Sequence, residues 1–118
     1  MTVAGTAVLG QRKKANQKEV ESIYNSIKTF GPDVYSAEKN KLKTNSKVYF
    51  DANYLKDNGY LKVDTIKNPS NSKDDCDVYL LINKDSDNNM FDAYVNCSGL
   101  DPKGDINPAE DPNYTQVK

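Results

Sequence analysis

The sequence contains no histidine, and only two of its 118 residues are cysteines. The absence of histidine removes the commonest general base and the commonest metal ligand. Cys76 and Cys97 are too few for a structural zinc site, and their separation excludes a C-x-x-C motif. We also find no Ser/His or Cys/His pair and no glycine-rich phosphate loop. The sequence therefore predicts that the protein is not an enzyme and holds no cofactor.

The sequence also has no large surplus of either charge, because it contains 16 Lys and Arg residues and 17 Asp and Glu residues. Nucleic-acid-binding proteins usually carry a clear basic surplus or stripe, and here the only basic run is Arg12–Lys14, so there is no nucleic-acid signature. The apolar stretch 3–9 is much too short to span a bilayer, and we find no complete signal peptide. With 36% hydrophobic residues and eight tyrosines, the composition predicts one small, folded, soluble domain.

Residues 10–30 are predicted to form an amphipathic helix. Its hydrophobic residues recur at helical spacing and should pack on the rest of the domain: Val20, Ile23, Tyr24, Ile27 and Phe30. Gly31-Pro32 should end this helix, because proline lacks an amide hydrogen and disfavours helix in the preceding residue. Residues 2–9 carry no charged side chain. If they are helical, they extend the same helix with an almost wholly apolar circumference.

The middle of the chain is predicted to be mostly irregular. Residues 35–47 are polar and rich in lysine, which indicates a loop, with or without a short helical start. Asp51 can cap a short helix over 52–58, and Gly59 can end it. We expect a further loop at 70–75. The tail from Asp101 should be irregular, and either docked or frayed.

A β-hairpin is predicted over 76–83 and 90–97, because both segments favour strands and turn-forming residues lie between them. If the turn is centred between Ser86 and Asp87, Cys76 lies opposite Cys97. Opposed positions on paired strands come within disulfide range. The hairpin therefore favours a Cys76–Cys97 disulfide, the alternative being two small apolar side chains in a reducing compartment.

Two other groups of side chains have a functional and a structural interpretation. Calcium could bind oxygen-rich loops that include Asn83, Asp85, Asp87, Asn88 and Asn89, or Asp101, Asp105, Asn107, Glu110 and Asp111. Neither loop has the EF-hand spacing, so plain turns are favoured. Five tyrosines could form a ligand platform, but a core between helix and sheet is favoured: Tyr49, Tyr54, Tyr60, Tyr79 and Tyr94.

The segment LGQRKKANQKEV, residues 9–20, resembles the stretch that follows the membrane-embedded part of type IV pilins and type II secretion pseudopilins. YLKDNGYLKVDTIKNP, CDVYLLI and AYVNCSG are similar to the globular half of pilin-like proteins from Gram-positive bacteria. The prepilin cleavage motif and most of the apolar half-helix are absent from the sequence. We expect that the chain starts inside the pilin helix, with Met1 as an added initiator.

The resemblance implies an α+β fold, with a long N-terminal helix (1–34) packed on a small antiparallel sheet in a globular head (35–118). It implies a structural subunit of an extracellular filament, anchored in the membrane before assembly and partnered by its own copies and minor pilins. Residues facing these neighbours would be Arg12, Lys13, Lys14, Lys18, Glu21, Asn25 and Lys28. The alternatives are a pseudopilin of a type II-like secretion system and a small secreted surface binding module.

Overall fold

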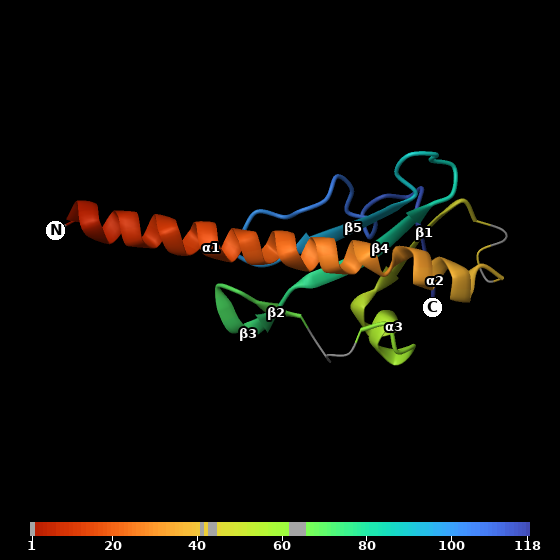
Figure 1. Ribbon diagram of the computed structural model, residues 1–118, viewed down its shortest axis with the longest axis horizontal. Coiled ribbons are helices and arrows are strands. Elements are labelled where there is room, and N and C mark those ends of the chain that lie inside the picture. Colours follow the sequence, from red (N-terminus) through yellow and green to blue (C-terminus); the bar gives the residue numbers. More distant parts are fainter. Residues whose placement is uncertain (1, 41, 43–44, 62–65) are drawn as a thin grey trace.

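A computed structural model describes residues 2–40, 42, 45–61 and 66–118, with side chains from residue 13 onward. Helix α1 (Thr2–Thr29) is followed by one turn at Phe30 and then by α2 (Gly31–Glu38) (Figure 1). The predicted end of the first helix is therefore correct, but Pro32 also lies in the first turn of a second helix, where its missing amide hydrogen costs nothing. Residues 35–38 consequently form the short helical start of the segment expected to be a loop.

Four strands form the main sheet, in the order β5-β4-β1-β6. They are β1 (Lys47–Asp51), β4 (Asp77–Asn83), β5 (Phe91–Asn96) and β6 (Thr115–Gln116). The α+β class and the helix-on-sheet arrangement agree with the sequence prediction, as does the β4–β5 hairpin. The sheet is mixed rather than purely antiparallel, because β6 pairs with β1 in parallel.

Two smaller elements complete the head. Helix α3 (Ala52–Asp57) begins at Asp51, whose Oδ1 accepts a hydrogen bond from the backbone amide of Tyr54 at 2.8 Å, as the predicted cap requires. Strands β2 (Lys67–Asn68) and β3 (Asn71–Asp75) form a separate hairpin. The loop expected at 70–75 is thus wrong, because backbone pairing with β2 organises a segment whose side chains are all exposed.

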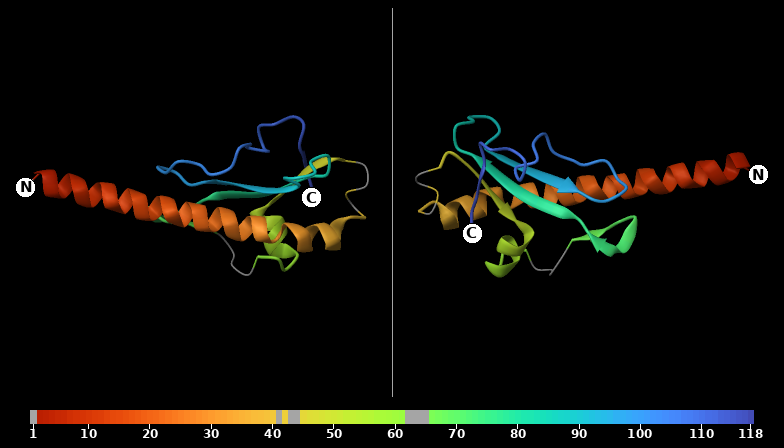
Figure 2. Two further views of the ribbon diagram at one scale, coloured as in Figure 1. Left: turned by 45° about the horizontal axis from the view of Figure 1, so that its top comes forward. Right: turned by 180° about the vertical axis from the view of Figure 1, so that it is seen from behind.

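The main sheet separates two layers (Figure 2). Helices α1 and α2 cover one face, and the C-terminal tail crosses the other. The face beneath the helices is aliphatic except for Phe50, and its side chains are buried together with those of α1 and α2: Val20, Ile27, Val34, Val48, Phe50, Leu80, Ile82, Ala93 and Val95. This core is where α1 joins the head.

The expected tyrosine core is only partly present. Tyr54 and Tyr60 pack against the helix–sheet core. Tyr49, Tyr79 and Tyr94 do not, because each alternates with a core residue along its strand and therefore points to the other face. Tyr49 is nonetheless 91% buried, since the tail covers that face.

Candidate functional site

Helix α1 is in contact with the head over only part of its length. Its N-terminal part projects beyond the sheet (Figure 1), and its contacts with the sheet are to β5 and β4. The side-chain amide of Gln17 both donates to the backbone carbonyl and accepts from the backbone amide of Asp101, at 2.7 and 3.0 Å. Lys13 and Lys14, which precede it, are exposed. Among the described residues, no helix is both long enough and apolar enough to cross a bilayer.

The residues expected to pack on the sheet lie against the core. Val20 and Ile27 are fully buried. Ile23, Tyr24 and Phe30 are half-buried and pack against the same cluster. The C-terminal half of α1 thus presents one apolar stripe to the head.

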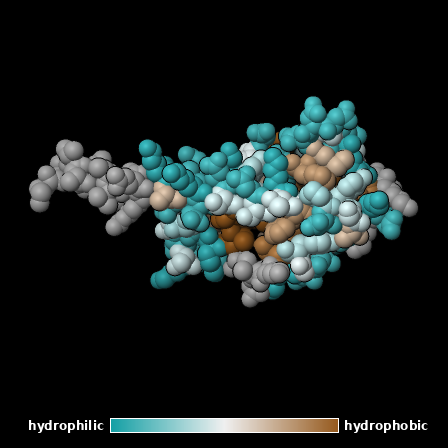
Figure 3. All heavy atoms as spheres, viewed as in Figure 1, coloured by the Kyte–Doolittle hydropathy of each residue, from teal (hydrophilic) through white to brown (hydrophobic). Residues whose placement is uncertain are grey.

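The residues expected to face neighbouring subunits lie mostly on the free surface of α1. Lys13, Lys14, Lys18, Glu21 and Asn25 are exposed. Lys28 is half-buried, with its Nζ 5.6 Å from the centre of the Tyr24 ring. The side chain of Arg12 lies outside the described residues. Most of the face shown in Figure 3 is hydrophilic, with hydrophobic residues gathered near the centre of the head.

Tyr24 links α1 to β5 and to the tail. Its hydroxyl donates to Asp92 Oδ1 at 2.5 Å, and Lys103 Nζ lies 5.5 Å from its ring centre. Burial, followed by the hydrogen bond and the negative charge of Asp92, raises the pKa of Tyr24 above its ordinary value. The neutral phenol is therefore the form that holds these three elements together.

The predicted disulfide is confirmed. Cys76 and Cys97 are bonded, with their Cα atoms 4.4 Å apart, and they directly continue the register in which Asp77 lies opposite Asn96. The backbone amide of Cys76 also donates to the carbonyl of Ile66 at 2.7 Å. One end of the main sheet is thereby fastened where the β2–β3 hairpin joins it.

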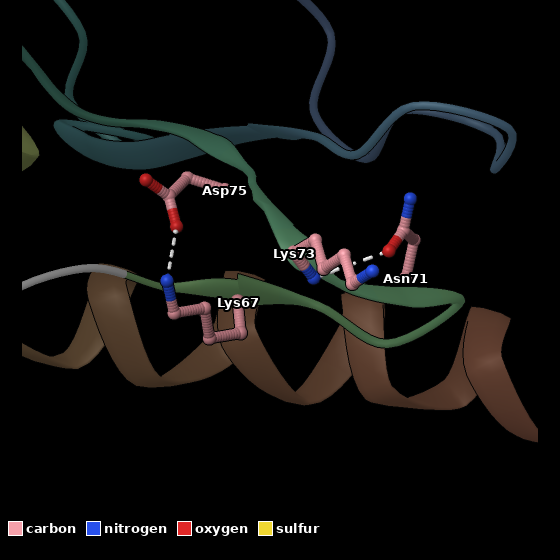
Figure 4. A network of polar contacts seen from close by, with 4 residues as sticks. All are labelled: Lys67, Asn71, Lys73 and Asp75. Carbon is pink, nitrogen blue, oxygen red and sulfur yellow. Dashed lines mark hydrogen bonds and ion pairs between the residues drawn. The ribbon is translucent and has the colours of Figure 1, made fainter.

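The β2–β3 hairpin is held by polar contacts (Figure 4). Lys67 Nζ lies 2.9 Å from Asp75 Oδ1, and the backbone amide of Lys73 donates to Asn71 Oδ1 at 3.1 Å. Both members of the ion pair are at least half exposed, so it contributes little stability. Asp75 is the last residue of β3, and Cys76 alone separates it from β4.

The tail is docked. The amides of Lys103 and Val95 each donate to the other's carbonyl at 2.9 Å, and the amide of Val117 donates to the carbonyl of Tyr49 at 2.9 Å. Gly104 has a φ of 122°, and a Cβ at that position would lie 3.0 Å from the Cα of Tyr94. The tail therefore needs glycine to pass closely over β5.

A cleft of about 340 Å³ lies where the ends of β1 and β4 meet the start of α3 and the tail. Tyr49 and Tyr79 line it, with ring centres 5.5 Å apart in an edge-to-face arrangement. The charged residues that line it within the described ranges are all acidic: Asp51, Asp75 and Asp77. Burial, and then the charge of Asp77, raises the pKa of Tyr79.

Sequence reasoning missed this cleft, because it assigned all five tyrosines to one core. The missed signal is the alternation in VYFD and DVYLLI, which places Tyr49 and Tyr79 on the face opposite Phe50 and Leu80. The meeting of these strands with the tail has no sequence signal, since Gln116 is far from both in the chain.

The oxygen-rich loops considered for calcium form turns. Asn83 Oδ1 accepts from the amide of Asp85 at 3.1 Å, and Asn107 Oδ1 accepts from the amide of Ala109 at 3.2 Å. Asp111 Oδ1 accepts from the amide of Asn113 at 2.9 Å. Within the described part of the chain, no three His, Cys, Asp or Glu side chains are grouped as a metal site would require.

No family model, no curated protein and no solved structure matches the chain. The resemblance to pilins therefore rests on residues 9–20 and on the segments of the head that carry it. The description of the fold comes from the structure alone, which shows a long helix packed on a mixed four-stranded sheet and one disulfide bond.

Proposed function

We propose that this chain is a structural subunit of a type IV pilus or a related cell-surface filament. The observation that carries the proposal is α1, which runs without a break from Thr2 to Thr29 through the basic run and into the head. Only its C-terminal part packs on the sheet, while its N-terminal part projects from the head (Figure 1). A second copy can therefore reach the projecting part without disturbing the core.

The composition of α1 supports the same role. Residues 2–9 carry no charged side chain, and the basic run follows directly. A helix that is apolar all round is stable in lipid or in a bundle with other helices, and not in water. Moving from the membrane to a bundle of its own copies would keep such a helix buried. Basic residues at the end of an apolar segment are typical of the membrane interface.

The head supports a location outside the cell. A small domain stabilised by one disulfide is typical of oxidising compartments. We therefore place the protein at the cell surface, in the membrane before assembly and afterwards in a filament with its own copies and minor pilins. A pseudopilin of a secretion system would have the same build and would differ in its partners.

Fractionation of cells that express the complete gene tests this proposal. We expect the protein in the membrane fraction and in filaments sheared from the surface, with Cys76 and Cys97 joined. A protein found only in the cytosol with both thiols free would contradict it. The coding sequence upstream of Met1 is a second test, since a prepilin cleavage motif followed by apolar residues is expected there.

The aromatic, acidic cleft favours one alternative, a small secreted surface module that binds a ligand. That role predicts a standard signal peptide upstream and a protein that stays monomeric in the culture medium. The two roles therefore give opposite results in the same fractionation.

A further inference from the structure

The first 18 residues and the rest of the chain carry opposite net charge. The first 18 residues contain Arg12, Lys13, Lys14 and Lys18 and no acidic residue, so their net charge is +4. The whole chain has a net charge of −1, which leaves −5 on residues 19–118. The first part of α1 therefore carries an unbalanced positive charge, whereas acidic residues outnumber basic ones in the rest of the chain.

The lysines at the basic end are exposed. Lys13, Lys14 and Lys18 are exposed and make no ion pair with any residue that the structure describes. Lys14 and Lys18 are one helical turn apart and lie on the same side of α1, about 6 Å apart along its axis. This spacing presents two ammonium groups together to a neighbouring surface.

The cleft of the head has the complementary chemistry. Among the described residues, its lining includes Asp51, Asp75 and Asp77 and no basic residue. Asp51 is occupied by the Tyr54 amide and by Gln116 Nε2, at 2.8 and 3.1 Å, and Asp75 by Lys67. Asp77 is exposed and makes no ion pair within the described residues, so its carboxylate is available.

The aromatic walls of the cleft suit the same ligand. An ammonium group is attracted to the face of a tyrosine ring within about 6 Å of its centre. The chain already uses this contact at Tyr24, where two lysine ammonium groups lie 5.5 and 5.6 Å from the ring centre. The ring of Tyr79 and the carboxylate of Asp77 are therefore both available to one incoming lysine.

We propose that the cleft bounded by Tyr79 and Asp77 receives the basic segment Lys13–Lys18 of a second copy of this chain. The proposal rests on the filament function and names the contact between subunits that such a filament would use. The two copies meet through different surfaces, the cleft of one and helix α1 of the other, so the contact is heterologous. A heterologous contact that does not close into a ring repeats indefinitely and generates a helical filament.

Carbodiimide cross-linking of the purified chain tests this contact, because the reagent joins a lysine to a carboxylate that touches it. An equimolar mixture of ¹⁴N- and ¹⁵N-labelled chains is cross-linked, and mass spectrometry identifies peptides that pair one light with one heavy partner. We expect mixed cross-links between Lys14 or Lys18 and Asp77. Their yield should fall as the salt concentration rises, because salt screens the attraction between exposed charges. Their absence at the highest soluble concentration would overturn the proposal.

Charge reversal separates this contact from non-specific attraction. Asp77→Lys alone and Lys14→Glu with Lys18→Glu should each abolish these mixed cross-links, because each variant lacks one of the two reactive groups and places like charges opposite each other. Mixing the two variants should restore cross-links between positions 14 and 77. The matched controls are Asp87→Lys and Lys39→Glu, which reverse exposed charges elsewhere and should leave the yield unchanged. Equal losses in variants and controls would also overturn the proposal.

Failure of the proposed contact can be distinguished from failure of the proposed filament function. If cells assemble filaments but Asp77→Lys changes neither assembly nor cross-linking, the function stands and the contact is wrong. If cells assemble no filaments, the function fails whatever the cross-links show. Cross-links to Asp77 from basic proteins added as competitors, with none between copies, would instead favour the ligand-binding module.

Discussion

One face of the main sheet is covered by α1 and α2, and the other by the C-terminal tail (Figure 2). On the helix side the contacts are apolar, and Val20, Phe50 and Leu80 are fully buried. On the tail side, Tyr79 and Tyr94 alternate with those core positions, and an acidic cleft opens beside them. Regular helix packing excludes water, whereas an irregular tail leaves gaps and polar edges. We therefore expect most of the stability to come from the first face, while the proposed contact between copies uses the second.

Removing the largest side chain from the helix side should have the largest effect. Phe50 is completely buried, so Phe50→Ala should lower the free energy of unfolding by about 3–5 kcal/mol. Tyr79→Ala, on the tail side of the same sheet, should cost only about 1–2 kcal/mol because the ring is half exposed. Urea unfolding of both variants measures the difference. Equal losses would show that the two faces do not divide these roles.

Opening the disulfide should have the next largest effect. The bond joins residues 21 positions apart, and closing a loop of that size restricts the unfolded chain by about 3 kcal/mol. The double variant Cys76→Ser with Cys97→Ser should lose this amount, measured by the same urea titration. Wild-type protein under reducing conditions serves as the comparison and should match the variant. A variant as stable as oxidised wild type would mean that the bond contributes nothing.

Displacing the tail should have an intermediate effect. Gly104→Ala places a Cβ against the backbone of Ala93 and Tyr94 at a positive φ, so the tail must move, at about 1–3 kcal/mol. Gly59→Ala is the matched control, because Gly59 also has a positive φ but no atom within 4 Å of the added Cβ. Hydrogen exchange should become faster at the Val117 amide in Gly104→Ala alone. Unchanged exchange would contradict a docked tail.

Breaking the link between helix and tail should have the smallest effect. Tyr24→Phe removes the hydrogen bond to Asp92 and should cost about 1 kcal/mol at neutral pH. Its effect should depend on pH. The pKa of Tyr24 is raised in the folded state, so above about pH 10 the unfolded chain loses this proton first and stability falls.

The pH dependence is measured by thermal unfolding between pH 8 and about pH 11, a range chosen to cross the ordinary tyrosine pKa. Tyr24→Phe should flatten the alkaline decline without abolishing it, because the pKa values of Tyr79 and Tyr114 are raised as well. A decline as steep as that of the wild type would show that Tyr24 is not tied to Asp92.

The local elements could be predicted because short-range physics specifies them. The stripe from Val20 to Phe30, the Asp51 cap and the β4–β5 hairpin each follow from residues within a few positions of one another. The disulfide followed from the hairpin register. Strand β3 could not be predicted, because its exposed polar residues favour a loop and only pairing with β2 makes it a strand.

The sequence by itself determined a helix with an apolar stripe, a basic run at its start and a hairpin that brings Cys76 to Cys97. Those features depend on periodicity and on neighbours in the chain. Only the tertiary structure decided that β6 joins β1 in parallel, that the tail covers the tyrosine face, and that Tyr79, Asp77 and Gln116 meet in one cleft. The physical reason is that these contacts join segments far apart in sequence, and no local pattern specifies which distant surface an irregular tail will cover.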